Sequence, residues 1–179
     1  MANISVKYGD ELSVYYYYPE NIKPNVSLES GKLAMDFYGS PEISTKADNY
    51  KLIIVLPEAT ALTEAAINTD VGNVDINGIS LDSLTVEADC GNVTLKDMEV
   101  KNLEADLDLG NLTITDSTID TSDVSVDMGN YEAKGSYEAV SADVSMGNII
   151  LESDVATDDM DLNLDVSMGN CKVNGKNYL

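Results

Sequence analysis

The dipeptide Gly-Asn recurs at nearly constant intervals through the C-terminal two-thirds of the chain. Successive copies lie 19, 19, 19, 18 and 22 residues apart, in a chain that has only 12 glycines. The copies are Gly72-Asn73, Gly91-Asn92, Gly110-Asn111, Gly129-Asn130, Gly147-Asn148 and Gly169-Asn170. A fixed period of this length is typical of a repeat architecture in which each unit stacks on the next.

Apolar residues occupy fixed places around each of these glycines. The second and fourth residues after the glycine are apolar in every copy, and alternate residues before it are apolar, as in Leu103-Ala105-Leu107-Leu109. Period-two alternation predicts half-buried strands, and a single repeat cannot bury its own apolar face. We therefore predict an all-β, single-domain parallel β-solenoid (β-helix) with coils of about 19 residues. The general bias of parallel crossovers predicts a right-handed coil.

The residue immediately before each glycine is also apolar. These residues are Val71, Cys90, Leu109, Met128, Met146 and Met168. Because they continue the upstream alternation, we expect them to point inward, with the three methionines filling the core. Cys90 and Cys171 are then expected to be two separate buried thiols, several coils apart and beyond disulfide reach.

Residues 1–68 lack the Gly-Asn dipeptide but still show strand patterns. Strands are expected at residues 4–8, 12–18, 25–28, 33–38 and 50–56, and the nearly continuous apolar run from Lys51 to Pro57 predicts a strand buried on both faces. We expect this region to cap or extend the solenoid formed by residues 69–179, because an open last coil exposes a sheet edge. A last hairpin is expected at residues 174–179.

The chain is strongly acidic. It has 32 acidic residues against 10 basic ones, all lysines, for a formal charge of −22, and it contains no His or Arg. Such a surface repels nucleic acid and anionic lipid, so we expect no nucleic-acid partner. No apolar run is long enough to cross a bilayer, so we also expect no membrane insertion. Without His or Arg, the commonest general base and the usual bidentate anion binder are missing, so we expect the protein not to be an enzyme. The patterned hydrophobic residues, 44% of the chain, argue against disorder.

Four aspartates share one place in the repeat, two residues before the glycine: Asp70, Asp89, Asp108 and Asp127. They are expected to form one outward column, in which neighbouring carboxylates repel by about 1 kcal/mol in bulk water. Calcium would offset this repulsion, whereas a solvated face screened by salt needs no ion. Serine takes the same place at Ser145 and Ser167. We expect no cofactor, with calcium on this column as the alternative.

Two further sets of residues have expected roles. Stacked asparagines can form an amide ladder, so a structural ladder is predicted for Asn73, Asn92, Asn111, Asn130, Asn148 and Asn170. The run Tyr15-Tyr16-Tyr17-Tyr18 places alternate rings on opposite faces of a strand. Outward tyrosines stack on sugars or anchor proteins, so Tyr15 and Tyr17 are candidate ligand contacts beside the simpler interpretation of a plain strand.

The order of these parts resembles a known family. An "IIVLP" strand within Leu52 to Pro57 is followed by the repeats "TDVGNVDI", "ADCGNVTL" and "LDLGNLTI". This pattern is similar to bacterial adhesins described as β-strand-repeat domains of unknown function. The resemblance implies a location at the cell envelope or outside the cell, behind a signal or anchor, and it implies no catalytic residues. Residues 1–10 lack the apolar segment of a secretion signal, so the chain is expected either to be cytosolic or to have its export or anchor segment outside this sequence.

Three functions follow as hypotheses from these observations. The first is a non-catalytic bacterial cell-surface or envelope protein, an adhesin or binding scaffold for an unidentified glycan or protein. The second is a self-assembling or spacer protein with a mechanical role, and its oligomeric state is open. The third is a calcium-stabilised carbohydrate-active enzyme, which the lack of long cleft-forming loops disfavours.

Overall fold

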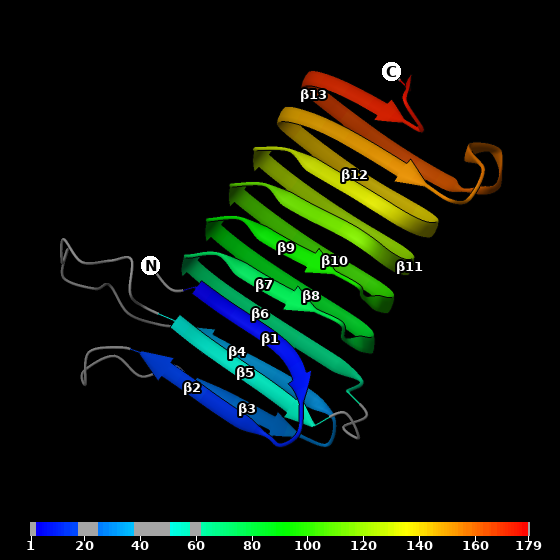
Figure 1. The fold of residues 1–179 in the computed structure, drawn as a ribbon. Helices are drawn as coiled ribbons and strands as arrows, with labels where there is room; N and C mark the ends of the chain where they lie inside the picture. Colours follow the sequence, from blue (N-terminus) through cyan, green and yellow to red (C-terminus); the bar gives the residue numbers. More distant parts are fainter. Residues whose placement is uncertain (1–2, 18–24, 38–50, 58–61, 179) are drawn as a thin grey trace.

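The chain forms a β-solenoid in which a single sheet winds into stacked coils (Figure 1). Buried apolar side chains fill the interior of the coils. The computed structural model describes residues 3–17, 25–37, 51–57 and 62–178. The predicted all-β solenoid with coils of about 19 residues is confirmed. The strands of the N-terminal region are β1 (Asn3–Gly9), β2 (Ser13–Tyr17), β3 (Asn25–Glu29), β4 (Lys32–Phe37) and β5 (Lys51–Pro57).

The remaining strands stack coil upon coil toward the C-terminal end. They are β6 (Glu64–Val71), β7 (Val74–Asn77), β8 (Ser80–Cys90), β9 (Val93–Lys96), β10 (Glu99–Leu109), β11 (Leu112–Met128), β12 (Tyr131–Ser153), β13 (Asp161–Val173) and β14 (Lys176–Asn177). From β6 onward, every coil pairs in parallel with its neighbours, and only the short β14 folds back antiparallel on β13. This pairing forms the C-terminal hairpin.

The spacing of buried residues shows where each coil turns. One coil points inward at Val93, Leu95, Met98, Val100, Leu103, Ala105 and Leu107, and the next coil begins inward at Leu112. Within a side, the inward residues are two apart, as alternation requires. The interval becomes odd after Leu95, after Val100 and after Leu107, so the alternation changes phase there. These three phase changes mark three corners, and the Gly-Asn dipeptide forms the last of them.

The irregular spacings of the repeat have local causes. The 18-residue interval arises in the coil at Gly135, where the register between β11 and β12 shifts between Ile114 and Ser117. The 22-residue interval contains an insertion at the rim of the coil, with a short 3₁₀ turn at Thr157–Asp159. Both changes lie at corners, so the inward columns of the sides remain in register.

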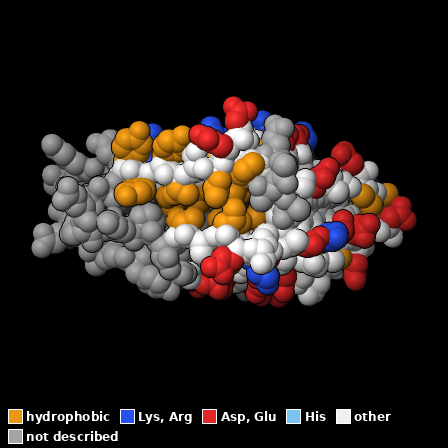
Figure 2. Space-filling model, turned by 90° about the horizontal axis from the view of Figure 1, so that it is seen from below, with side chains coloured by type: hydrophobic (Ala, Val, Ile, Leu, Met, Phe, Trp, Pro, Cys, Tyr) orange, Lys and Arg blue, Asp and Glu red, His pale blue; other side chains and the backbone are white. Residues whose placement is uncertain are grey.

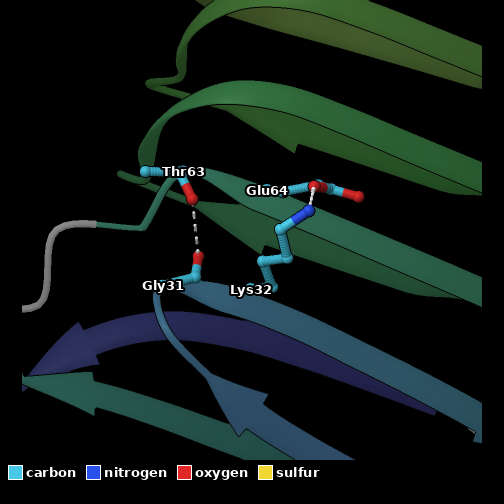
Figure 3. Close-up of polar contacts among 4 residues, drawn as sticks. All are labelled: Gly31, Lys32, Thr63 and Glu64. Carbon is cyan, nitrogen blue, oxygen red and sulfur yellow. Dashed lines mark hydrogen bonds and ion pairs between the residues drawn. The ribbon is translucent and has the colours of Figure 1, made fainter.

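The N-terminal strands extend the same sheet beyond the Gly-Asn repeats. β1 lies in parallel between β5 and β7, and β4 pairs in parallel with β6. At the junction with β6, the carbonyl of Gly31 accepts hydrogen bonds from the backbone N–H and the hydroxyl of Thr63, and Lys32 forms an ion pair with Glu64 (Figure 3). The sheet then ends on antiparallel strands, β2 on one side and β3 on the other.

The β5 strand differs from its expected burial. Its inward residues Leu52, Ile54 and Leu56 are buried, but Ile53 and Val55 are only partly covered. The outward residues of this strand are covered only in part, so the continuous apolar run does not produce a strand buried on both faces.

Two tyrosines are fully buried in the core. Tyr131 and Tyr137 occupy inward positions of β12, in register with Leu112 and Ile119 of β11. Among the described residues, neither hydroxyl finds a hydrogen-bond partner. Burial raises the pKa of Tyr131 to about 12, and burial also raises the pKa of Tyr137. These two buried hydroxyls therefore lower the stability locally within a mostly apolar core.

Candidate functional site

The Gly-Asn corners bring the backbones of successive coils into direct contact. The N–H of Gly91 donates to the carbonyl of Leu109 over 2.9 Å, and Gly72, Gly110 and Gly129 donate in the same way to the next coil. A Cβ added at Gly110 would lie 1.6 Å from the carbonyl oxygen of Gly91, far inside any allowed contact. Only glycine permits this stacking, so the repeated glycine has a structural role.

The asparagine after each glycine bonds to the asparagine of the next coil. Oδ1 of Asn92 accepts from the backbone N–H of Asn111 over 3.1 Å and from its side-chain amide over 2.9 Å. The same pair of bonds recurs at every step from Asn73 to Asn170, although the first amide contact is long at 3.5 Å. The ladder thus runs the full height of the repeats and engages these amides with one another rather than with a ligand.

The apolar column before the glycines is not in the core, which corrects the prediction from alternation. The buried residues on either side of a corner, such as Leu107 and Leu112, are five apart, so the alternation cannot continue through the corner. The residue before glycine therefore points off the rim into solvent. Leu109, Met128, Met146 and Met168 are all exposed, and the expectation that the methionines fill the core is wrong.

The two cysteines have different environments. Cys171 is buried, as expected, and burial raises the pKa of its thiol. Cys90 belongs to the exposed column and is itself exposed, so the expectation of a second buried thiol is wrong for the reason just given. Both thiols are free, as predicted from their separation along the axis.

The four aspartates of the predicted acidic column are exposed on the outer surface. Asp70, Asp89, Asp108 and Asp127 lie in consecutive coils, between positions that pair in register. In the part of the chain that the structure describes, no three His, Cys, Asp or Glu side chains are grouped so that they could share a metal ion. Calcium on this column stays the alternative to a solvated face screened by salt.

The tyrosine run lies on β2, the last strand at one end of the sheet. Tyr15, Tyr16 and Tyr17 are 53%, 52% and 64% exposed. Tyr15 and Tyr17 pair with Ile53 and Lys51 on the outer face of β5, as the alternation predicted. Tyr18, the fourth member of the run, lies outside the described residues.

The inner face of β2 is exposed as well, which the sequence did not indicate. Val14 and Tyr16 pair with the buried residues Ile54 and Leu52, yet both side chains are largely exposed, as is Leu12. Figure 2 looks onto this end of the molecule and shows apolar side chains gathered there. We call Leu12, Val14, Tyr15, Tyr16 and Tyr17 the tyrosine edge. The run of four tyrosines was the only signal for it, because the ring on the inner face was expected to be buried.

Formal charge is distributed unevenly along the chain. Residues 1–57 contain seven acidic and five basic residues, for a formal charge of −2, whereas residues 58–179 contain 25 acidic and five basic residues, for −20. The tyrosine edge thus belongs to a nearly neutral region of the sequence, and most of the negative charge belongs to residues 58–179.

A shallow groove lies on the side of the solenoid, along the corner that follows Val100. Its volume is about 390 Å³, and its lining includes Leu62, Ser80, Glu99 and Thr118. Lys101 also lines it and pairs with Asp82 at 2.6 Å, and this hydrogen bond and the carboxylate charge raise the pKa of Lys101. Two of its charged groups, Lys101 and Asp82, are exposed and paired with each other, so the groove does not present them as buried, convergent groups.

Comparison with known proteins identifies a family but no individual relative. Across the described residues, no helix has the length and apolar character needed to span a bilayer. No curated protein and no solved structure matches the chain. One family model, described as Toastrack DUF4097, matches residues 2–177. The chain therefore belongs to the Toastrack DUF4097 family, a β-repeat family of unknown function.

Proposed function

We propose that this protein is a non-catalytic binding scaffold of the bacterial cell surface or envelope, which engages a glycan or protein ligand through the tyrosine edge. The observation that supports this proposal is the exposure of three consecutive tyrosines on both faces of an end strand. Exposed aromatic residues gathered at one place are typical of interaction sites rather than of ordinary surface.

The chemistry of the tyrosine edge suits such ligands. Tyr15 and Tyr17 lie on one face of β2, about 7 Å apart by the rise of a strand. Each ring offers an apolar surface that can stack on a sugar or an apolar side chain, and each hydroxyl offers a hydrogen bond. Tyr16, with Val14 and Leu12, adds apolar surface on the opposite face.

The charge distribution supports engagement through this end. Bacterial envelopes carry anionic polymers, and a body of formal charge −20 is repelled by them at long range. The nearly neutral region approaches a surface with much less repulsion. Repulsion between the acidic coils and an anionic surface therefore favours an approach in which the tyrosine edge faces the ligand.

A binding screen tests this proposal. The full chain is applied to arrays of bacterial and host glycans and of matrix proteins, beside the variants Tyr15→Ala and Tyr17→Ala. We expect binders of the wild-type chain to be lost in both variants. Tyr178→Ala is the matched control, because Tyr178 is also exposed but lies in the C-terminal segment after β14. Binding that survives both β2 substitutions would contradict the proposal.

A second function, self-assembly, is favoured by the position of β2 at the end of the sheet. Among the described strands its one partner is β5, and its other edge then has backbone groups to offer to another strand. Light scattering after size-exclusion chromatography, over a wide concentration range, distinguishes the two functions. Oligomers that grow with concentration in the absence of any ligand would favour the spacer or scaffold role, whereas a monomer at all concentrations would favour the binding role.

A further inference from the structure

The exposed column of residues that precede the repeat glycines becomes rich in sulfur toward the C-terminal end. Met128, Met146 and Met168 are 45%, 42% and 62% exposed. The buried methionines among the described residues, Met98 and Met160, lie elsewhere in the coil. Methionine usually fills cores, so three exposed methionines at one repeated position call for a separate explanation.

These three methionines are direct neighbours across the sheet. Met128 pairs in register with Met146, and Met146 pairs in register with Met168. Parallel strands place successive members of such a column about 4.8 Å apart. All three side chains leave the same corner of their coils, so they project into solvent side by side.

Neighbouring members of this column are spaced close to the separation of sulfurs around one ion, and the two outer members are about twice as far apart. With metal–sulfur bonds of about 2.3 Å, three sulfurs around one trigonal ion lie about 4 Å apart. Methionine has three flexible side-chain bonds, so the two outer thioethers can lean toward the central one without backbone movement. The rigid stack of glycines beside the column holds the three backbones in place.

The ligand type determines which ion fits. Neutral thioethers bind soft ions such as Cu(I), and they bind calcium, magnesium and zinc poorly. The negative field of the solenoid raises the local concentration of any cation, and Asp127 is exposed next to Met128. The negative charge of the solenoid therefore attracts cations to the column, and the thioether sulfurs favour soft monovalent ions among them.

We propose that Met128, Met146 and Met168 form a three-thioether site for one Cu(I) ion, which Ag(I) can also occupy. The proposal goes beyond the binding function assigned to the tyrosine edge and does not depend on it. The site ends at Met128, because the next member of the column is Leu109, which has no donor atom. Cys90 lies one coil further on and is excluded from the site.

The test is a titration of the full chain carrying Cys90→Ser, labelled with ¹³C in the methionine methyl groups. Silver nitrate, and Cu(I) held anaerobically with a chromophoric competitor, are added in turn. The methyl signals of Met128, Met146 and Met168 are expected to shift together and to saturate at one equivalent, while those of Met98 and Met160 stay in place. Because thioethers carry no proton, the affinity is expected to be constant between about pH 5 and about pH 8.

Substitution by leucine separates metal binding from apolar packing. Met146→Leu keeps the apolar surface and volume but removes the central donor, and we expect it to weaken Cu(I) binding by about tenfold or more. Met98→Leu is the matched control and is expected to leave the affinity unchanged. Unchanged affinity in Met146→Leu, or silver-induced shifts that do not include these three methyl groups, would overturn the proposal. The tyrosine edge is distant in sequence and intact in these variants, so ligand binding there is unaffected by either result.

Discussion

At the scale of single residues, the corner glycines set the strictest requirement in the molecule. We expect Gly110→Ala to destabilise the fold by about 3 kcal/mol or more, because its Cβ would lie 1.6 Å from the carbonyl oxygen of Gly91 and the coils would have to separate. Urea unfolding followed by circular dichroism measures the change. Gly78→Ala is the control, since a Cβ there meets nothing within 4 Å and only the backbone φ of +68° is strained. Its cost is expected to be about 1 kcal/mol.

A buried tyrosine predicts how stability depends on alkaline pH. The folded-state pKa of Tyr131 is about 12, above the ordinary value of 10.0, so the neutral ring favours the folded state. The stabilisation is complete below about pH 10 and is lost as the pH rises toward about 12. We expect Tyr131→Phe to lose less stability than the wild-type chain between pH 8 and pH 11, as measured by urea unfolding at each pH. At pH 8 the variant should match or slightly exceed the wild type, because an unpaired hydroxyl is removed. A larger alkaline loss in the variant would contradict this account.

At the scale of elements, the asparagine ladder joins one coil to the next. In the middle of the ladder, Asn111 accepts two hydrogen bonds from Asn130 and donates two to Asn92. We expect Asn111→Ala to cost about 1 to 2 kcal/mol in unfolding free energy. Asn73→Ala should cost less, since Asn73 begins the ladder and accepts one good bond and one long one. Equal costs at the two positions would show that the ladder does not act as a chain of linked bonds.

The sides of the coil were predictable from sequence, and the corners were not. Alternation along segments such as Leu103-Ala105-Leu107 placed the strands and their inward residues correctly. The same alternation wrongly placed Cys90 and Met128 in the core. A corner changes the phase of the alternation, and alternation within a strand does not predict where a corner begins. The five-residue interval between the inward residues Leu107 and Leu112 shows that the alternation changes phase at this corner. The interval can be recognised in the sequence once a corner is assumed to change the phase.

The tyrosine edge was predictable only in part. The alternation placed Tyr15 and Tyr17 outward, as found, but it also implied that Tyr16 would be covered. Whether an inward residue is buried depends on what lies beyond the strand, and β2 is the last strand of its side. The residue pattern of one strand does not show whether that strand lies in the middle or at the end of the sheet.

At the scale of the whole molecule, the net negative charge should determine how added ions change the thermal stability. With a formal charge of −22, self-repulsion opposes the compact state, so the melting temperature is expected to rise with added sodium chloride. Millimolar calcium should raise it no more than sodium chloride of matched ionic strength, since no described carboxylates are grouped to share an ion. Differential scanning calorimetry in excess EDTA, and then in calcium, makes the comparison. A calcium-specific rise would identify a metal site on the column of Asp70, Asp89, Asp108 and Asp127.

The binding role of the tyrosine edge is tested most directly by the salt dependence of ligand affinity. The dissociation constant of a captured glycan or protein is measured from low to high sodium chloride for the wild-type chain, for Tyr15→Ser with Tyr17→Ser, and for Tyr178→Ser. We expect a shallow dependence on salt, a loss of about tenfold or more in the double variant, and no loss in the Tyr178 control. A dissociation constant that rises steeply with salt and is unchanged in the double variant would place binding on the acidic faces and contradict the account.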